Sequence, residues 1–93
     1  MKSVELSPDA KGDLARLEDF LFEKSPRADF AAVQAIRATV ESLKAFPERG
    51  GPVGDGRRRQ IIVAFGRDGY VVRYRVTPEV ILITRIYHGR ERR

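Results

Sequence analysis

Residues 59–87 read RQIIVAFGRDGYVVRYRVTPEVILITRIY, and the architecture of the chain follows from this stretch. It contains three runs rich in valine, isoleucine and aromatic residues, which are residues 59–65, 70–76 and 80–87. Short turn sequences separate the runs, GRDG at residues 66–69 and TPE at residues 77–79. Such runs with short turns between them are typical of β-hairpins. We therefore predict three antiparallel strands in a meander.

Two helical patterns precede these strands. Ser7-Pro8 and Ser25-Pro26 each place a capping residue before a proline that suits the first turn of a helix. After each start signal, apolar residues recur every three or four positions, as on one side of a helix. They are Ala10, Leu14, Leu17 and Leu21, and then Val33, Ile36, Val40 and Leu43. The second pattern stops before Pro47, so the sequence predicts a helical hairpin.

A short strand and a loop complete the predicted order. Residues 4–6 alternate apolar and polar side chains before Ser7-Pro8, and we expect a short strand there. Residues 48–56 are rich in glycine, and we expect a surface loop without regular structure. The resulting order of strand, two helices and three strands defines a single small α+β domain over residues 1–93.

The composition excludes several classes of protein. With 93 residues, 42% of them hydrophobic and 33% charged, the chain is long enough for one domain with one core. It has no cysteine and one histidine, so thiol chemistry is excluded, and we expect no metal and no cofactor. The longest apolar run, residues 61–65, is too short for a membrane span, and residues 1–6 lack a secretory signal. We therefore expect a cytoplasmic protein without a membrane partner.

Positive charge is concentrated in the second half of the chain. Residues 1–46 carry 7 basic and 8 acidic side chains, whereas residues 47–93 carry 11 and 5. A basic surface of this kind suits an anionic partner, either nucleic acid or an acidic protein segment, and a solvated face has the same composition. Two arginine clusters are candidates for a target-binding surface: Arg57, Arg58 and Arg59 before the first predicted hairpin, and Arg90, Arg92 and Arg93 in the tail.

The predicted sheet is apolar on both faces. Strict alternation puts Tyr70, Val72 and Tyr74 on the face that the helices cover. The opposite face then forms a groove in which apolar and basic side chains alternate: Ile62, Val71, Arg73, Arg75, Ile81, Ile83, Arg85 and Tyr87. Two helices cover only one face, so we expect an acidic amphipathic peptide to bind in this groove. The alternatives are a loop of the chain or a second copy.

Three local sequences carry a resemblance to a known family. They are Leu6-Ser7-Pro8 before the first predicted helix, GYVVRYRV at residues 69–76 and RIYHGR at residues 85–90. In this order, with the elements between them, they resemble the RelE/ParE toxin superfamily over almost the whole chain. Its members are toxins of bacterial type II toxin-antitoxin systems, associated with growth inhibition and plasmid stabilization. The resemblance implies a co-encoded antitoxin as the cognate partner in the groove.

The superfamily includes two activities, cleavage of messenger RNA on the ribosome by RelE-like members and inhibition of DNA gyrase by ParE-like members. Cutting RNA at the ribose 2′-hydroxyl requires a base, an acid and cations near the phosphate. His88, Tyr87 and Arg85 are the candidates for these catalytic roles. Nuclease relatives carry a basic residue where this chain has Val71, and some use a tyrosine on a C-terminal helix that the five residues after His88 cannot form.

The resemblance therefore favours a ParE-like inhibitor of gyrase that has no catalytic residues. In this interpretation His88 closes the last strand, Gly89 turns the tail, and Tyr70 and Tyr74 pack in the core. The alternative is a RelE-like endonuclease with the ribosome and messenger RNA as partners. A third interpretation is a basic nucleic-acid-binding module without toxicity, which should bind less tightly as salt rises.

Overall fold

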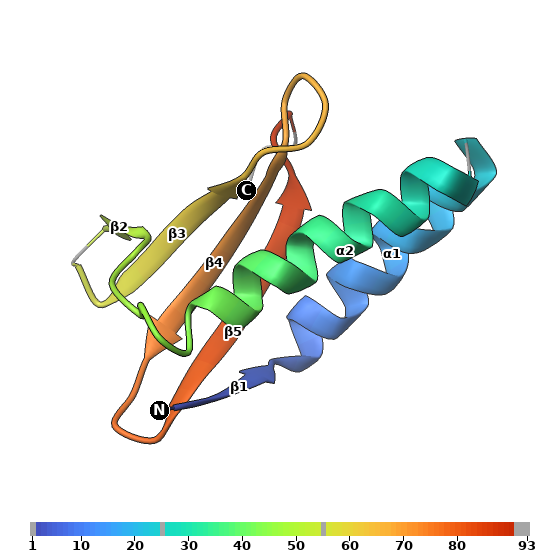
Figure 1. Cartoon of the computed structure of the whole chain (residues 1–93). Helices are drawn as coiled ribbons and strands as arrows, with labels where there is room; N and C mark the ends of the chain where they lie inside the picture. The colour runs from blue at the N-terminus through green and yellow to red at the C-terminus, as the bar shows by residue number, and fades with distance from the viewer. Residues whose placement is uncertain (1, 25, 55, 91–93) are drawn as a thin grey trace.

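The structure is a computed structural model that describes residues 2–24, 26–54 and 56–90, and the side chains of residues 21–24, 26, 28 and 29 lie outside the description. Its elements follow one another as in Figure 1: β1 (Ser3–Leu6), α1 (Pro8–Lys24), α2 (Pro26–Ser42), β2 (Gly51–Val53), β3 (Arg58–Val63), β4 (Tyr70–Val76) and β5 (Val80–His88). The predicted α+β class is confirmed. Leu21 and the predicted cap Ser25 fall outside the described side chains.

The five strands form one sheet in the order β1-β5-β4-β3-β2. Strands β3, β4 and β5 pair antiparallel in sequence, as predicted for the meander, and β1 pairs parallel with β5. The predicted strand at residues 70–76 matches β4 at both ends. The meander thus forms the centre of the sheet.

The segment 48–56 contains a strand, so the prediction that it has no regular structure was wrong. β2 pairs antiparallel with β3, and Gly51 lies opposite Gln60. The side chain of Tyr74 holds the segment, because its hydroxyl donates to the Pro47 carbonyl at 2.8 Å and accepts from the Gly50 N–H at 2.8 Å. These tertiary contacts produce an edge strand that local propensity does not favour, and an edge position tolerates proline.

The first helix begins as predicted, and its cap also joins it to the sheet. The Ser7 hydroxyl accepts from the Ala10 N–H at 3.1 Å, which is the N-cap hydrogen bond. The same hydroxyl donates to the Thr84 carbonyl at 3.1 Å, and the Ser7 N–H donates to the Ile83 carbonyl at 2.9 Å. The start of α1 is therefore fixed against β5.

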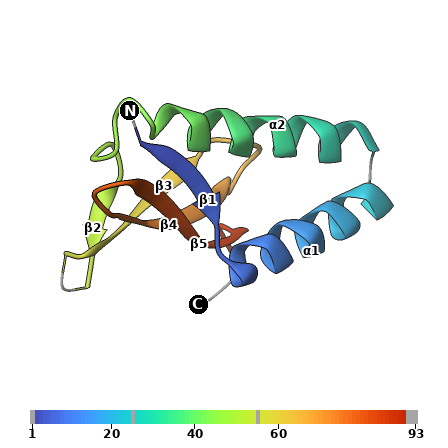
Figure 2. The same cartoon turned by 90° about the horizontal axis from the view of Figure 1, so that it is seen from below.

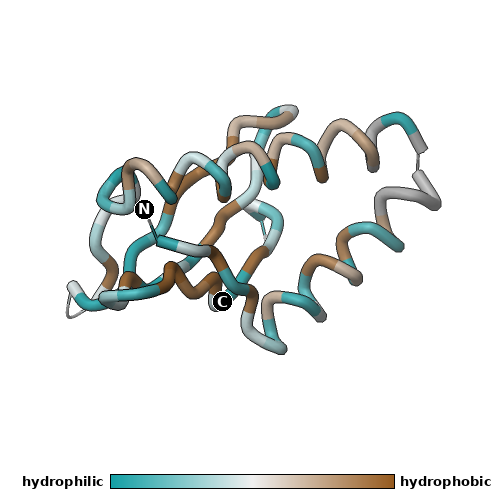
Figure 3. The backbone as a smooth tube through the Cα atoms, turned by 60° about the horizontal axis from the view of Figure 1, so that its bottom comes forward, coloured by the Kyte–Doolittle hydropathy of each residue, from teal (hydrophilic) through white to brown (hydrophobic). Residues whose placement is uncertain are grey.

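The helices lie on one side of the sheet. Figure 2 shows α2 passing over one face, while α1 extends beside β1 and β5. The core between them contains buried residues from both helices and from the three central strands, among them Leu17, Ile36, Val63, Val72, Tyr74 and Ile86. Figure 3 shows hydrophobic segments along the strands and alternating hydropathy along the helices, as expected for helices with one buried side.

A β-bulge in β5 changes which of its residues face the helices. Arg73 of β4 pairs with Arg85, but the next residue, Tyr74, pairs with Ile83, so Thr84 is an extra residue on β5. Before the bulge, Ile81 and Ile83 therefore face the core, and both are 0% exposed. Their assignment to the opposite face was wrong, because it assumed unbroken alternation.

Candidate binding surface

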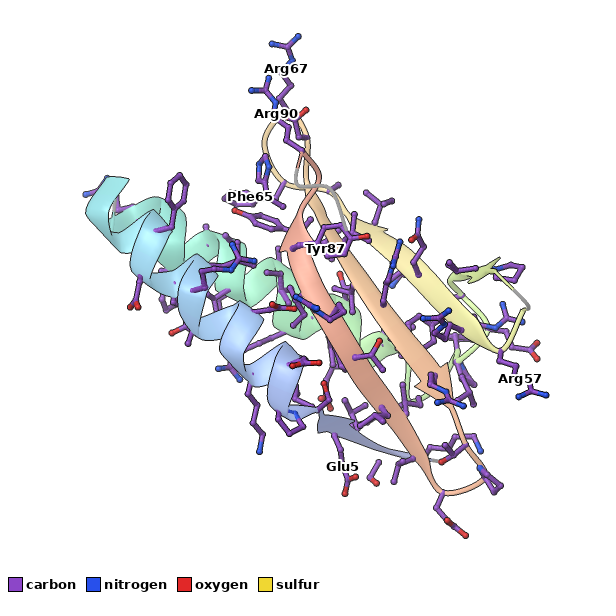
Figure 4. The ribbon with its side chains drawn as sticks, turned by 180° about the vertical axis from the view of Figure 1, so that it is seen from behind. Glu5, Arg57, Phe65, Arg67, Tyr87 and Arg90 are labelled. Atoms are coloured by element: carbon purple, nitrogen blue, oxygen red, sulfur yellow. The ribbon has the colours of Figure 1, made fainter. Side chains whose placement is uncertain are left out.

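We call the sheet face away from α2 the outer face, and Figure 4 looks onto it. The strand register arranges its side chains in three rows across β3, β4 and β5: Arg58, Arg75 and Leu82; then Gln60, Arg73 and Arg85; then Ile62, Val71 and Tyr87. Successive rows are two residues apart along β3 and β4, which is roughly 6 to 7 Å, and the extra residue Thr84 separates the first two rows on β5. Six of the eight predicted groove residues lie in these rows.

The third row is the apolar end of the outer face. Ile62 is 58% exposed, whereas Val71 and Tyr87 are buried. The guanidinium carbon of Arg73, in the second row, lies 5.6 Å from the centre of the Tyr87 ring, a cation–π contact. An exposed isoleucine beside a cation and an aromatic ring gives this end a mixed character.

In the second row, two arginines lie directly opposite one another, and both have intramolecular partners. The Arg73 Nε donates to the Gln60 Oε1 at 3.3 Å. Arg85 forms a bidentate ion pair with Asp13 of α1, with its Nε 2.8 Å from Oδ2 and its Nη2 3.0 Å from Oδ1. The second row is therefore partly neutralised by the chain itself.

Asp13 is a buried carboxylate that the sequence interpretation did not identify. Its Oδ2 also accepts from the Ile86 N–H at 3.0 Å, at a point where β1 has ended and where, among the residues that the structure describes, β5 has no strand neighbour on that side. Burial raises the pKa of Asp13, but hydrogen bonds from Arg85 and Ile86 and the charges of Arg85 and Arg16 outweigh it, so the pKa is below its ordinary value. A signal was present, because Asp13 falls in the helical stripe of Ala10 and Leu17.

The first row contains two arginines that, unlike those of the second row, have no polar partner in the described part of the chain. Arg58 and Arg75 lie directly opposite one another on β3 and β4, and both are exposed. Within the described ranges no hydrogen bond or ion pair involves either guanidinium. Arg58 was predicted in a different cluster from Arg75, and the strand register brings the two together.

The predicted target-binding arginines do not form one surface. Figure 4 shows Arg57 and Arg90 at opposite ends of the sheet. Arg59 has a structural contact, since its Nη1 donates to the Gly50 carbonyl at 2.6 Å. Arg90 pairs with Asp68 of the β3–β4 turn at 2.7 Å. Arg92 and Arg93 lie outside the described residues.

The three candidate catalytic side chains do not converge. Tyr87 and His88 are consecutive in β5, so they point to opposite faces of the sheet, and Arg85 is paired with Asp13. The His88 ring stands edge-on to Tyr70 with centroids 5.4 Å apart, and its Nδ1 accepts from the Arg90 N–H at 3.2 Å. These contacts give His88 the position at the strand end that the structural interpretation predicts.

A second apolar feature lies on the helix side. It is a cavity of about 470 Å³ between α1, α2, β1 and β5, lined inside by Leu6, Leu14, Val40 and Ile86. Arg37, Glu41 and Lys44 of the α2 region line it as well. The sequence did not predict this cavity, because it depends on the packing distance between α2 and β1.

Comparison with known proteins defines the class of protein that this fold and surface represent. The family model for the ParE toxin of the type II toxin-antitoxin system, parDE, matches residues 4–93. Toxin RelE3 of Caulobacter vibrioides is 40% identical over 93 residues, which is 100% of both chains. Toxin RelE1 of the same organism is 40% identical over 91 residues, 98% of this chain and 97% of its own.

A solved structure supports the same fold. The chromosomal ParDE TA system from P. aeruginosa contains a chain that superposes with a TM-score of 0.74 at 24% identity, covering 95% of this chain and 96% of its own. The chain thus belongs to the ParE toxin family of type II toxin-antitoxin systems, within the RelE/ParE superfamily. Neither helix in the described ranges has the length and apolar content that crossing a membrane requires.

Proposed function

We propose that this toxin inhibits growth by binding DNA gyrase without covalent chemistry, and that a co-encoded antitoxin neutralises it by binding the outer face. The observation that carries the proposal is the divergence of the candidate catalytic groups. Tyr87 and His88 point to opposite faces, and the Arg85 guanidinium is held by Asp13. A protein that acts by binding needs no such convergence, and we expect it to act in the cytoplasm.

The position after Tyr70 supports the same proposal. In nuclease relatives this position is basic, whereas here it is Val71, an apolar side chain that is buried beside Tyr87. A buried valine cannot stabilise the charge that develops on a phosphate during RNA cleavage. One of the cations that the reaction requires is therefore missing at this point of the outer face.

Ribosome-dependent cleavage of messenger RNA remains the second candidate, and two observations favour it. Arg73 and Tyr87 lie together on the outer face, with the guanidinium 5.6 Å from the ring centre. A cation beside a phenol could contact a phosphate and its neighbouring oxygen. The names of the two Caulobacter relatives, toxins RelE3 and RelE1, point to the same branch.

A supercoiling assay separates the two functions. Purified toxin is added to DNA gyrase, relaxed plasmid and ATP, with and without the co-encoded antitoxin. We expect inhibition that the antitoxin reverses, and we expect Tyr87→Phe to inhibit equally, because the ring and its contact with Arg73 remain. Full supercoiling at saturating toxin would argue against the proposal. Codon-linked cuts in primer extension, abolished by Tyr87→Phe, would establish the endonuclease.

A further inference from the structure

Two cross-strand pairs of arginines lie next to each other on the outer face, and they differ in whether the described part of the chain provides them with polar partners. Arg73 and Arg85 are opposite one another; Arg73 donates a hydrogen bond to Gln60, and Asp13 neutralises the charge of Arg85. Like charges directly opposite on neighbouring strands destabilise a sheet unless something compensates them. The second pair, Arg58 and Arg75, is opposite in the same way and has no hydrogen bond or ion pair from the described part of the chain.

The outer cross-strand neighbours of this second pair are apolar. Val53 of β2 lies opposite Arg58, and Leu82 of β5 lies opposite Arg75. The acidic side chain in this row is Glu5 of β1, and Leu82 stands between it and Arg75. Both apolar neighbours are half-buried, and each lies beside one of the two exposed arginines. A carboxylate bound there would be partly removed from water, which strengthens its interaction with arginine.

We propose that Arg58 and Arg75 form a carboxylate clamp for the antitoxin, in which one acidic side chain of the antitoxin sits between the two guanidinium groups. This inference rests on the proposed function. Side chains directly opposite on antiparallel strands have Cβ atoms about 4.5 to 5.5 Å apart, so both arginines can reach one carboxylate. The planar guanidinium suits a carboxylate because it can donate two parallel hydrogen bonds to it.

The rest of the outer face indicates an acidic peptide in preference to nucleic acid. A phosphate backbone repeats its charge at every nucleotide and needs a continuous cationic track. Here the next row is already partly neutralised, and the row beyond it presents the exposed Ile62. The charge therefore falls off along the strands from Arg58 and Arg75 to Ile62, which matches a ligand with one acidic end and one apolar end.

The distance between the two ends defines the antitoxin segment further. The clamp and Ile62 are two rows apart, which is roughly 13 Å along the strands. An extended peptide of about 3.3 Å per residue spans this distance in about four residues. A helix that rises 1.5 Å per residue spans it in about nine. We therefore expect an acidic residue and an apolar residue at one of these two spacings in the antitoxin.

Titration of the full-length toxin with its co-encoded antitoxin tests the clamp. Arg58→Gln and Arg75→Gln should each weaken binding by about tenfold or more, because each removes one side of the clamp. Arg67→Gln is the matched control, since Arg67 is also exposed and lies in the turn at the far end of the sheet (Figure 4). This control removes the same charge and should change the affinity by less than about twofold.

A charge swap identifies the partner residue. Arg75→Glu should bind poorly, and one Glu→Lys or Asp→Lys substitution in the antitoxin should restore binding to Arg75→Glu while weakening binding to the wild type. Thermal unfolding of each variant checks the fold, and we expect no loss, because removing one of two opposed charges relieves repulsion. Affinity of Arg58→Gln and Arg75→Gln equal to that of the wild type would overturn the clamp and leave the proposed function intact.

Two other outcomes overturn the inference in different ways. If the wild-type toxin does not bind the co-encoded antitoxin, the proposed neutralisation fails, and the clamp fails with it. A fluorescent 15-nucleotide oligothymidylate serves as the second probe. If Arg58→Gln and Arg75→Gln lose binding to this oligonucleotide but keep full affinity for the antitoxin, Arg58 and Arg75 bind nucleic acid and not the antitoxin.

Discussion

Asp13 is a buried residue of α1 that fixes one arginine of the outer face. Its carboxylate holds Arg85 in a bidentate ion pair and satisfies the Ile86 N–H at the free edge of β5. A buried polar backbone group without a partner costs about 1 to 3 kcal/mol. The Asp13 side chain thus replaces the strand neighbour that β1 provides only for the first half of β5.

We expect Asp13→Ala to lower the free energy of unfolding by about 1 to 3 kcal/mol, because the Ile86 N–H loses its acceptor. Urea unfolding measured by circular dichroism provides the value. Asp9→Ala is a suitable control, since Asp9 is exposed in the first turn of the same helix. An equal loss in both variants would show that a general effect on α1, and not the buried contact, is responsible.

The same carboxylate should make stability depend on pH. The pKa of Asp13 is lowered in the folded chain, so its contribution is fully present above the pKa of the unfolded chain, about 3.9, and is lost as pH falls through the folded value. We expect the difference in unfolding free energy between wild type and Asp13→Asn to shrink as pH falls from about 5 to 2. A difference that stays constant over this range would contradict the assignment.

The side chain of Tyr74 provides hydrogen-bond partners for the backbone next to β2, as Asp13 does for β5. Its hydroxyl bonds both Pro47 and Gly50, and burial raises the pKa of this hydroxyl despite the hydrogen bond from Gly50. We expect Tyr74→Phe to cost about 1 to 3 kcal/mol, because the Gly50 N–H is left without an acceptor. Amide hydrogen exchange should locate the loss in residues 47–53. Unchanged exchange there would show that β2 does not depend on the hydroxyl.

Among the elements, those with strong local patterns were predictable and those built by tertiary contacts were not. Alternating β-branched residues and clear turns predicted β4 at both ends, and the proline and serine signals predicted the start of α1. Strand β2 has a glycine- and proline-rich sequence, and contacts with Tyr74 and Arg59 from elsewhere in the chain hold it. The bulge at Thr84 has no local sequence signal, so unbroken alternation misplaced Ile81 and Ile83.

In the candidate binding surface too, local patterns predicted some features, and contacts between distant parts of the chain determined the others. Alternation along β3 and β4 correctly placed Ile62, Val71, Arg73 and Arg75 on the outer face. The pairing of Arg85 with Asp13 joins residues 72 positions apart, and nothing local in the sequence specifies it. The opposition of Arg58 and Arg75 needs the strand register, which depends on the length and geometry of the turn at residues 66–69.

The turn after β5 gives an element-level test. Gly89 donates to the Gly69 carbonyl at 2.9 Å, and a Cβ atom at Gly89 would overlap the backbone oxygen of Asp68. We expect Gly89→Ala to cost about 1 to 3 kcal/mol through this overlap. Gly12→Ala in α1 meets nothing within 4 Å and should stabilise the protein by about 0.5 to 1 kcal/mol. Thermal unfolding of both variants should therefore shift in opposite directions, and a shift of both in one direction would refute the prediction.

The whole molecule is a sheet with helices on one side and an outer face that is cationic at one end and apolar at the other. Exposed hydrophobic side chains occur on both sides, because Ile62 is 58% exposed on the outer face and Phe30 is 67% exposed on α2. The pair Arg58 and Arg75 is specific to the outer face. An acidic antitoxin segment gains ion pairs with this pair as well as apolar contact with Ile62 there.

Hydroxyl-radical footprinting of the toxin with and without its co-encoded antitoxin shows which face the antitoxin binds, because it reports the exposure of individual side chains. We predict that oxidation of Ile62 falls strongly in the complex, while that of Phe30 on α2 changes little. If Phe30 and the side chains lining the cavity beside α2 are protected and Ile62 stays as reactive as in the free toxin, the antitoxin binds the helix side, and the assignment of the outer face is wrong.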